Sequence, residues 1–360
     1  MLQENFTCKR DNLTIRGLLF RPETSSDKKL PLVILSHGFM ATLNSTKEYA
    51  QRFADMGFIS IIFDFPGGSM HSQSDGDTTK MSLLSEIEDL KAVIEAALLD
   101  PNVDKDDITL LGCSMGGFVS AMVAKELGSK IKRIILFYPA FCMPDNARSG
   151  QMIHAKFDPK NIPDTLFCDE MKLGKCFVSA VINLDPFEQI KDYKGQVLLI
   201  HGTADDLVLP QYSQKAYKAY LEARNNQPDK DLQLLMIDNA NHGFWGPQAN
   251  EWNKLAFFGI KNFLEGKEEL LTVDVVLTDC QDSFEGDKKI SKLFFKGQAQ
   301  GPYFTGEVQT PAYDQQIHIG NKTISCCADY TLLGKDYRGQ DCYVKVKNQL
   351  IGQEDKDEDI

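Results

Sequence analysis

The stretch Ile108-Thr109-Leu110-Leu111-Gly112-Cys113-Ser114-Met115-Gly116 decides the fold of this chain. An apolar run of strand length ends at Gly112 and a helical pattern begins at Gly116, so Gly-x-Ser-x-Gly lies at a strand-to-helix turn. Such a tight turn exposes the serine hydroxyl at the top of the sheet, and small residues on both sides let strand and helix approach. Because the amino end of a helix also favours developing negative charge, we interpret Ser114 as a nucleophile.

On both sides of this turn, short apolar runs alternate with longer helical patterns. The runs have strand length and are nearly continuously apolar, as in a parallel sheet covered by helices on both faces: residues 32–36, 59–64, 108–112, 133–138, 197–201 and 232–237. The helical patterns cover residues 45–56, 83–98, 116–127, 211–223 and 251–264. The alternation predicts an α/β fold with a parallel sheet. Before it, residues 5–21 alternate around Asp11-Asn12 and predict a β-hairpin.

Two stretches interrupt the alternation. Residues 140–193 put roughly fifty residues between consecutive strands, more than a crossover needs, and we interpret them as a cap inserted over the carboxyl edge of the sheet. Residues 267–350 consist of short alternating runs and predict a small all-β, barrel-like module. We therefore expect a catalytic domain over residues 1–266, the β module over 267–350 and an acidic, disordered tail over 351–360.

A nucleophilic serine needs a base and an orienting acid, which in this fold follow it in the order acid, then histidine. His242 lies in a glycine-containing loop after the last predicted strand, from which its imidazole can reach back to Ser114. In the loop after the strand at 197–201 we favour Asp205 as the acid. Asp206 is the first alternative, although it is better suited to a helix cap or to solvent, and Asp185 is the second.

An oxyanion hole needs backbone N–H donors that point at the tetrahedral oxygen. Met115, the residue after the nucleophile, supplies one donor. The second should come from the loop after the first central strand, where we choose Phe39 because Gly38 gives the backbone room to turn.

The other histidines indicate structural roles. His37 and His201 each precede a glycine at a strand end and are expected to connect neighbouring loops by hydrogen bonds. His71, His154 and His318 have no partner at ligand spacing, and the nine cysteines include no Cys-x-x-Cys pair. The sequence therefore predicts no metal site.

Composition limits the partners of the chain. Its 360 residues are 42% hydrophobic, enough for a sizeable core, and its net charge of −12 repels nucleic acid. No apolar stretch reaches the roughly 18 residues of a membrane span, so no membrane partner is expected. A secretory leader pattern is also missing, and free cysteines suit a reducing compartment, which predicts a cytoplasmic protein.

Over residues 5–266 the chain resembles the cinnamoyl and feruloyl esterases of the α/β-hydrolase superfamily. The resemblance rests on the Ser114 motif and on four further segments: His37-Gly38-Phe39, His201-Gly202-x-x-Asp205, Asn241-His242-Gly243-Phe244 and, most specifically, the cap phrases Phe157-Asp158-Pro159-x-Asn161-Ile162-Pro163 and Leu173-Gly174-x-x-Phe177. It implies an α/β-hydrolase fold with an inserted cap. It also implies an esterase without a cofactor, in which Ser114 forms an acyl-enzyme and His242 activates water to release the acid.

In that family the cap contacts the aromatic ring of the substrate acid. Asp145 or Asn146, together with Phe177, falls near positions that would line such a pocket, and Phe177 replaces a tyrosine of some relatives. The resemblance thus implies a small-molecule ester as substrate, namely a hydroxycinnamate ester. A general short-chain acyl esterase or acyl peptidase with the same triad is the alternative. A catalytically idle binding protein is a third reading, against which the intact set of three residues counts.

Residues 267–350 resemble a small β-barrel family of unknown function. The resemblance runs from Phe295-Lys296-Gly297 to Gly306 and through residues 328–332. Since these residues contain no catalytic set, we expect a packing or oligomerisation module, which makes a homo-oligomer an option. Carbohydrate binding is the alternative role for this module.

Overall fold

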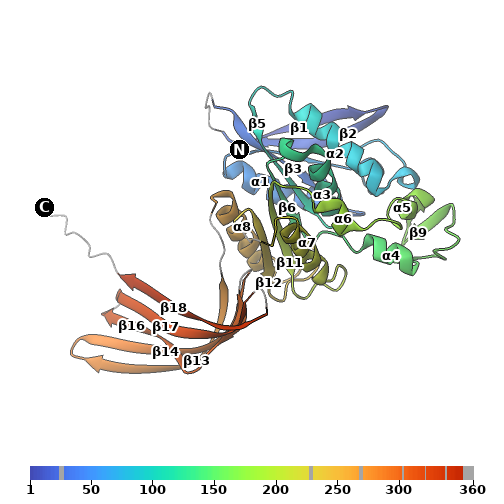
Figure 1. Cartoon of the computed structure of the whole chain (residues 1–360). Helices are drawn as coiled ribbons and strands as arrows, with labels where there is room; N and C mark the ends of the chain where they lie inside the picture. The colour runs from blue at the N-terminus through green and yellow to red at the C-terminus, as the bar shows by residue number, and fades with distance from the viewer. Residues whose placement is uncertain are drawn as a thin grey trace. The chain divides into compact units, whose positions relative to one another are not determined.

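The computed structural model describes residues 1–23, 28–226, 230–266, 271–301, 304–320, 322–336 and 339–351. The chain divides into two compact units, Met1–Glu268 and Glu269–Ile360, which we describe separately (Figure 1). Of the predicted acidic tail, Ile351 ends a strand and residues 352–360 lie outside the described residues. No helix among the described residues combines the length and the apolar character needed to span a bilayer.

The first unit is built on an eight-stranded sheet in the order β1-β2-β4-β3-β5-β6-β11-β12. β1 (Leu2–Arg10) and β2 (Leu13–Arg21) form an antiparallel hairpin, and β2 also pairs antiparallel with β4 (Ile59–Phe63). The remaining neighbours are parallel and comprise β3 (Leu30–Ser36), β5 (Val103–Cys113), β6 (Arg133–Phe137), β11 (Gln196–Gly202) and β12 (Leu232–Ile237). The prediction of an α/β fold is confirmed.

Helices cover both faces of this sheet. α2 (Leu83–Ala97), α3 (Met115–Leu127) and α7 (Gln211–Glu222) contribute to one buried apolar cluster, and α1 (Lys47–Asp55) and α8 (Ala249–Leu264) contribute to the other. β3 shows why its sequence is continuously apolar, since Leu32 and Ile34 join the first cluster whereas Val33 and Leu35 join the second. The alternation in sequence thus becomes a three-layer unit.

Residues 140–193 form a group of short elements between β6 and β11. They comprise α4 (Met143–Ser149), the hairpin of β7 (Gln151–Met152) and β8 (Ala155–Lys156), the hairpin of β9 (Thr165–Cys168) and β10 (Met171–Gly174), α5 (Lys175–Ser179) and α6 (Pro186–Ile190). Buried cap side chains such as Leu173 and Phe177 belong to the same apolar cluster as α3. The cap elements α4, α5 and β9 gather at one end of the sheet (Figure 1). The cap therefore shares a hydrophobic core with the helices of the sheet unit.

The second unit is an antiparallel sheet. Its strands are β13 (Thr272–Glu285), β14 (Lys288–Gln300), β15 (Phe304–Val308), β16 (Ala312–Ile319), β17 (Lys322–Asp336) and β18 (Asp341–Ile351). β15 and β16 lie one after the other between β14 and β17, as two halves of one interrupted strand. Phe295, Tyr330 and Leu332 belong to its small core.

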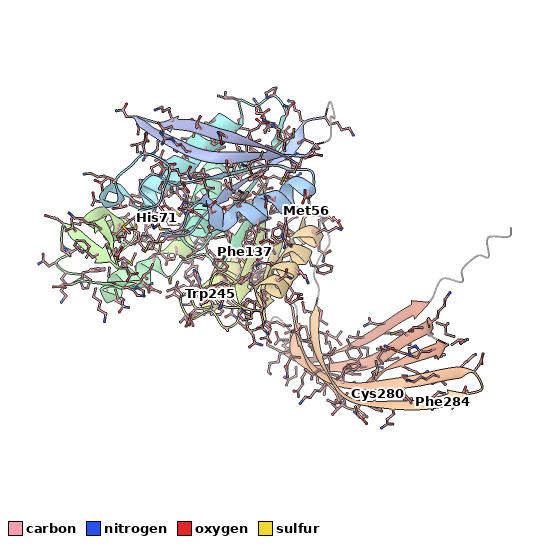
Figure 2. The ribbon with its side chains drawn as sticks, turned by 180° about the vertical axis from the view of Figure 1, so that it is seen from behind. Met56, His71, Phe137, Trp245, Cys280 and Phe284 are labelled. Atoms are coloured by element: carbon pink, nitrogen blue, oxygen red, sulfur yellow. The ribbon has the colours of Figure 1, made fainter. Side chains whose placement is uncertain are left out.

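This arrangement confirms the predicted all-β module, but the expected barrel-like closure is not seen in the part of the chain that the structure describes. Within the described residues β13 pairs only with β14 and β18 only with β17, so the two edges do not meet and the sheet stays open. On the edge strand β13, Cys280 and Phe284 are exposed to solvent (Figure 2).

Candidate active site

Ser114 occupies a strained turn between β5 and α3. Its φ of 54° lies in a region that residues other than glycine rarely adopt, and its N–H donates to the carbonyl of Phe137 over 2.9 Å. A Cβ on Gly112 would lie 2.2 Å from the carbonyl oxygen of Gly116, and one on Gly116 would lie 2.4 Å from that of His37. The two glycines of the motif thus allow the close packing that holds the serine in this conformation.

The structure brings Ser114, His242 and Asp205 into one hydrogen-bonded chain. His242 Nε2 lies 3.1 Å from Ser114 Oγ, and His242 Nδ1 lies 2.8 Å from Asp205 Oδ2. Because a carboxylate can only accept, Nδ1 carries the proton and Nε2 is free to accept from the serine hydroxyl. The ring of Tyr138 supports the imidazole, with 4.7 Å between ring centroids. This geometry can activate a serine for attack on a carbonyl carbon.

Asp205 is held as a carboxylate in a fully buried position. Burial alone would raise its pKa, but hydrogen bonds from His201 and His242 hold the pKa at about 2. Its second oxygen accepts from the backbone N–H groups of Leu207 (3.1 Å) and Val208 (2.9 Å). A charge fixed in this way can stabilise the imidazolium that forms when His242 takes a proton.

The two alternative acids lie elsewhere. Asp206 is exposed to solvent. Asp185 caps α6, where its side chain accepts from the N–H groups of Phe187 and Glu188. Neither carboxylate contacts His242 in the structure.

His37 and His201 each connect their own loop to a neighbouring segment, and both ring nitrogens of each are hydrogen-bonded. His37 Nδ1 donates to the carbonyl of Gly38 (2.8 Å), and its Nε2 accepts from the N–H of Phe65 (3.1 Å). His201 Nδ1 lies 2.7 Å from Ser213 Oγ, and its Nε2 lies 2.8 Å from the carbonyl of Val208. His201 Nε2 also lies 3.2 Å from Asp205, a contact with the active site that the sequence analysis missed.

The predicted oxyanion donors have free N–H groups. Met115 is the first residue of α3, where an N–H has no acceptor within the helix, and in the described residues neither this N–H nor that of Phe39 is hydrogen-bonded. Gly38 brings the Phe39 loop beside the nucleophile, since a Cβ on Gly38 would lie 3.1 Å from Ser114 Cβ. Two unused donors next to a nucleophile are the requirement for an oxyanion hole.

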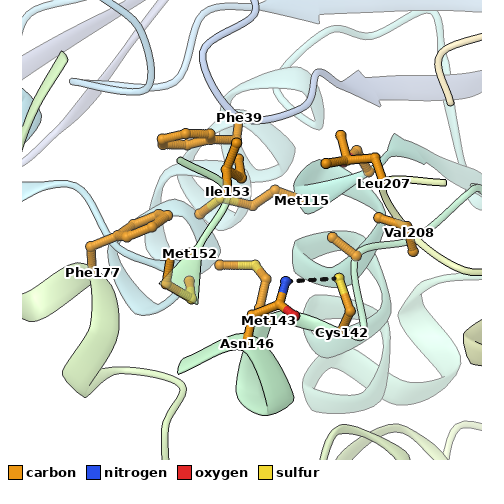
Figure 3. A pocket seen from close by; sticks show the side chains of 12 residues that line it. Phe39, Met115, Cys142, Met143, Asn146, Met152, Ile153, Phe177, Leu207 and Val208 are labelled. Carbon is orange, nitrogen blue, oxygen red and sulfur yellow. Dashed lines mark hydrogen bonds between the residues drawn. The ribbon is translucent and has the colours of Figure 1, made fainter. Parts of the chain in front are cut away.

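A largely apolar pocket opens at Ser114 (Figure 3). It has a volume of about 410 Å³ with its open mouth and is lined by Phe39, Ser114, Met115, Ala140, Cys142, Met143, Asn146, Met152, Ile153, Phe177, Leu207 and Val208. The rings of Phe39 and Phe177 stack at a centroid distance of 5.0 Å and form one wall. Besides Ser114, Asn146 is the polar side chain of the lining, and its Nδ2 donates to Cys142 Sγ over 3.6 Å.

Two of the three predicted substrate-binding residues lie at the pocket in the structure. Asn146 and Phe177 line the pocket, whereas Asp145 does not. Asp145 pairs with Arg148 at 2.7 Å and accepts from the hydroxyl of Tyr212 at 2.8 Å. The cap residues Met143, Met152 and Ile153 also line the pocket. The sequence could not indicate this, because Met143 lies in a helix of seven residues, Met152 in a strand of two and Ile153 in a turn, none long enough for a periodic pattern.

The three histidines without an assigned role differ from one another. His71 is exposed on a surface loop (Figure 2), and His318 pairs with Thr323 at 2.9 Å. His154 has no partner at ligand spacing in the sequence, but folding places Cys168 and Asp169 beside it. Their separation in sequence hides this cluster from a search by spacing.

The fold and this site define a serine hydrolase of the α/β-hydrolase superfamily. Residues 44–259 match the prolyl oligopeptidase family, and the chain belongs to that family.

Two curated relatives illustrate the range of the sequence similarity. The acylamino-acid-releasing enzyme of Rattus norvegicus is 23% identical over 249 residues, which are 64% of this chain and 31% of the rat protein. An uncharacterized 31.7 kDa protein of Escherichia coli, from the traX-finO intergenic region, is 36% identical over 90 residues, or 25% of this chain and 30% of that protein. The chain thus spans about a third of the length of these relatives.

Solved structures share the fold. Est1E from Butyrivibrio proteoclasticus with bound ferulic acid has a TM-score of 0.63 and 24% identity, covering 72% of this chain and 99% of Est1E. DcsB in complex with its substrate analogue has a TM-score of 0.54 and 21% identity, covering 74% and 99% of the two chains. At these identities the likeness establishes the fold.

Proposed function

We propose that this serine hydrolase cleaves carboxylic esters of aromatic acids, with hydroxycinnamate esters as the substrate class. The observation that carries the proposal is the apolar pocket that begins at Ser114 and has the stacked rings of Phe39 and Phe177 as a wall. A flat aromatic acyl group would bury its ring against this wall while its carbonyl carbon reaches the serine. The fold that the chain shares with Est1E, whose structure contains ferulic acid, supports the same class.

The proposed reaction proceeds through an acyl-enzyme. Ser114 Oγ attacks the ester carbonyl carbon as His242 Nε2 takes the hydroxyl proton, and the N–H groups of Met115 and Phe39 bind the oxyanion. Collapse of the tetrahedral intermediate breaks the bond to the alcohol, which leaves with the proton from His242. Water then loses a proton to His242 and attacks the acyl carbon, which releases the acid and restores Ser114.

The lining of the pocket supports an uncharged aromatic acyl group. The residues that line it carry no charged side chain, so a charged acyl tail would lose its hydration without compensation. Three methionines, Met115, Met143 and Met152, offer adaptable contacts to an aromatic ring. The amide of Asn146 can hydrogen-bond to one polar ring substituent. Since Phe177 has no hydroxyl, ring hydroxyls gain no partner from that position.

Release of acylated amino acids is a second candidate activity. It is favoured by membership of the prolyl oligopeptidase family and by the similarity to the rat acylamino-acid-releasing enzyme. The same triad would cleave an amide, with His242 protonating the leaving amine.

The deciding experiment compares kcat/KM for three substrates: methyl ferulate, p-nitrophenyl butyrate and acetyl-alanine p-nitroanilide. Ser114→Ala is the blank, and Ser179→Ala, at an exposed serine of the cap, is the matched control. We expect the ferulate ester to be preferred and its turnover to disappear in Ser114→Ala alone. Turnover of the butyrate ester only would overturn the aromatic-acid proposal, and preference for the anilide would establish the second candidate.

A further inference from the structure

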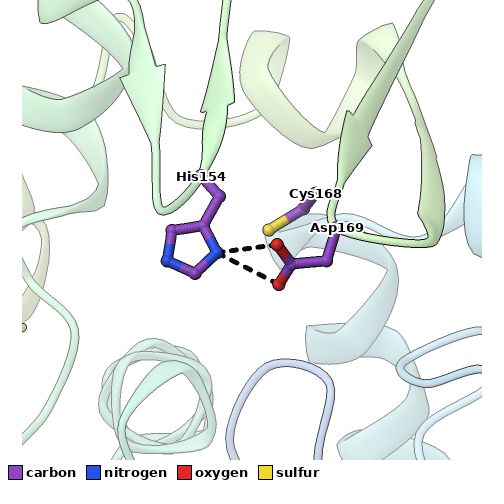
Figure 4. Close-up of side chains that lie close together, drawn as sticks. All are labelled: His154, Cys168 and Asp169. Atoms are coloured by element: carbon purple, nitrogen blue, oxygen red, sulfur yellow. Dashed lines mark hydrogen bonds and ion pairs between the residues drawn. The ribbon is translucent and has the colours of Figure 1, made fainter.

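Three side chains that can bind a metal ion converge in the cap, outside the active site (Figure 4). His154 lies in the turn between β7 and β8, Cys168 ends β9, and Asp169 begins the turn to β10. Their ligand atoms all lie within 4.8 Å of one another. His154 Nδ1 lies 2.9 Å and 3.0 Å from the two carboxylate oxygens of Asp169.

We propose that His154, Cys168 and Asp169 bind a divalent transition-metal ion of the zinc class, with water as the fourth ligand. Imidazole, thiolate and carboxylate are the ligands that zinc takes in proteins, whereas magnesium and calcium prefer sites made of oxygen. A tetrahedral site with these bond lengths separates its ligand atoms by about 3.3–3.7 Å. The ligand atoms of this cluster, all within 4.8 Å of one another, lie close to that spacing.

Charge and accessibility fit a bound ion. The thiolate of Cys168 and the carboxylate of Asp169 together carry the charge that neutralises a divalent cation. On binding, Cys168 releases its proton to solvent and the proton on His154 Nδ1 moves to Nε2, so that Nδ1 can coordinate. Cys168 is fully buried, whereas the side chains of His154 and Asp169 are 68% and 54% exposed. The ion thus has an entry path from solvent and a buried sulfur ligand beneath it.

Such an ion would connect two hairpins that are separate in sequence. The β7–β8 hairpin contributes His154, and the β9–β10 hairpin contributes the other two ligands. Met152 and Ile153, which directly precede His154, line the pocket at Ser114. An exposed His–Asp pair alone would need no metal, and the thiol at the same point is what distinguishes this cluster.

The test is a titration of the full chain with Co²⁺, a spectroscopic substitute for Zn²⁺, under reducing conditions. We expect a thiolate-to-cobalt charge-transfer band that saturates at one equivalent and disappears when Zn²⁺ is added. Cys168→Ser should abolish the band. His154→Gln and Asp169→Asn should weaken cobalt binding by at least the roughly 10- to 100-fold typical of groups that only orient a ligand.

Two matched controls test the assignment. Cys176→Ser changes another cysteine of the cap and His71→Gln changes an exposed histidine, and both should bind cobalt like the unaltered chain. Labelling of Ser114 by a fluorophosphonate probe checks that each variant is folded without measuring the metal. Absence of the band at saturating cobalt, or a band that persists in Cys168→Ser, would overturn the proposal. If Cys168→Ser does not fold, Asp169→Asn decides, because an unchanged cobalt affinity in that variant also overturns it.

Discussion

His201 Nε2 lies 3.2 Å from the same carboxylate oxygen of Asp205 that accepts from His242, and 2.8 Å from the carbonyl of Val208. The other oxygen of Asp205 accepts two backbone N–H groups, so the orienting acid is held from four directions. His201 itself is fixed through Ser213. The position of His242 therefore depends on a second histidine that does not touch the nucleophile.

We expect His201→Ala to lower kcat by about 10- to 100-fold, because a hydrogen bond to a charged group contributes about 1.5–3 kcal/mol. KM should change little, since His201 does not line the pocket. His201→Gln, whose amide can still donate to Asp205, should recover part of the activity. Steady-state kinetics of the three proteins provide the check. An unchanged kcat in His201→Ala would mean that the backbone donors alone position the acid.

Phe177→Ala should lower kcat/KM for methyl ferulate by about 10- to 100-fold, because it removes one of the two stacked rings of the pocket wall. The loss for p-nitrophenyl butyrate should be smaller, since a butyryl chain covers less of the wall. Phe167→Ala is the matched control, because this phenylalanine of the same cap is 61% exposed and does not line the pocket. Equal losses for both esters would show that Phe177 supports the cap rather than selects the acyl group.

Gly116→Ala should destabilise the fold by more than about 3 kcal/mol, because its Cβ would lie 2.4 Å from a backbone oxygen that cannot move aside. Gly117→Ala is the comparison. Its Cβ would meet the side chain of Pro139 at 3.0 Å, a milder contact that the higher helix propensity of alanine partly offsets. Urea denaturation should therefore rank Gly116→Ala well below Gly117→Ala in the free energy of unfolding. The reverse order would contradict the packing described at the turn.

The buried carboxyl group of Glu86 makes the free energy of unfolding depend on pH. Burial, and then the charge of Asp89, raises its pKa well above the usual value, so the folded state keeps it protonated. In the unfolded chain it ionises above about pH 4.5, so the stability it contributes is present below that pH and is lost as the pH rises towards its folded pKa. Each pKa unit between the two states amounts to about 1.4 kcal/mol.

Glu86→Gln should therefore gain more stability relative to the unaltered chain at pH 8 than at pH 5. Glu95→Gln, at an exposed position of the same helix, should show no such difference. Urea denaturation of the three proteins at both pH values measures the effect. A gain that is equal at pH 5 and pH 8 would show that Glu86 is ionised in the folded protein.

The central sheet could be predicted because its signals are local and long. Runs such as residues 232–237 match their strands without change, and the glycines around Ser114 mark a turn whose packing demands them. The helix α2 ends one residue before the predicted boundary. No helix-breaking residue in its last turn marks the end in the sequence, so the boundary could be predicted only to within a residue or two. Patterns that repeat over several turns or strands thus suffice for the scaffold.

The cap could not be predicted in the same way. Its strands β7 and β8 have two residues each, too few for any periodicity, and α4 has seven. Which of Asp145 and Asn146 faces the pocket depends on the rotation of that short helix, which only tertiary packing fixes. The approach of His154 to Cys168 and Asp169 likewise depends on two hairpins meeting in space.

The residues that line the pocket come from two parts of the chain, the segments around the catalytic residues and the cap. Phe39, Leu207 and Val208 come from loops and Met115 from the start of α3, all next to the reactive groups, whereas the residues from Ala140 to Phe177 belong to one continuous stretch of chain. A graft of this single stretch between relatives would replace the cap side of the pocket and leave Ser114, Asp205 and His242 in place. Substitutions within one segment of the chain can therefore change the shape of the pocket, while the residues that break the bond, which lie outside it, stay unchanged.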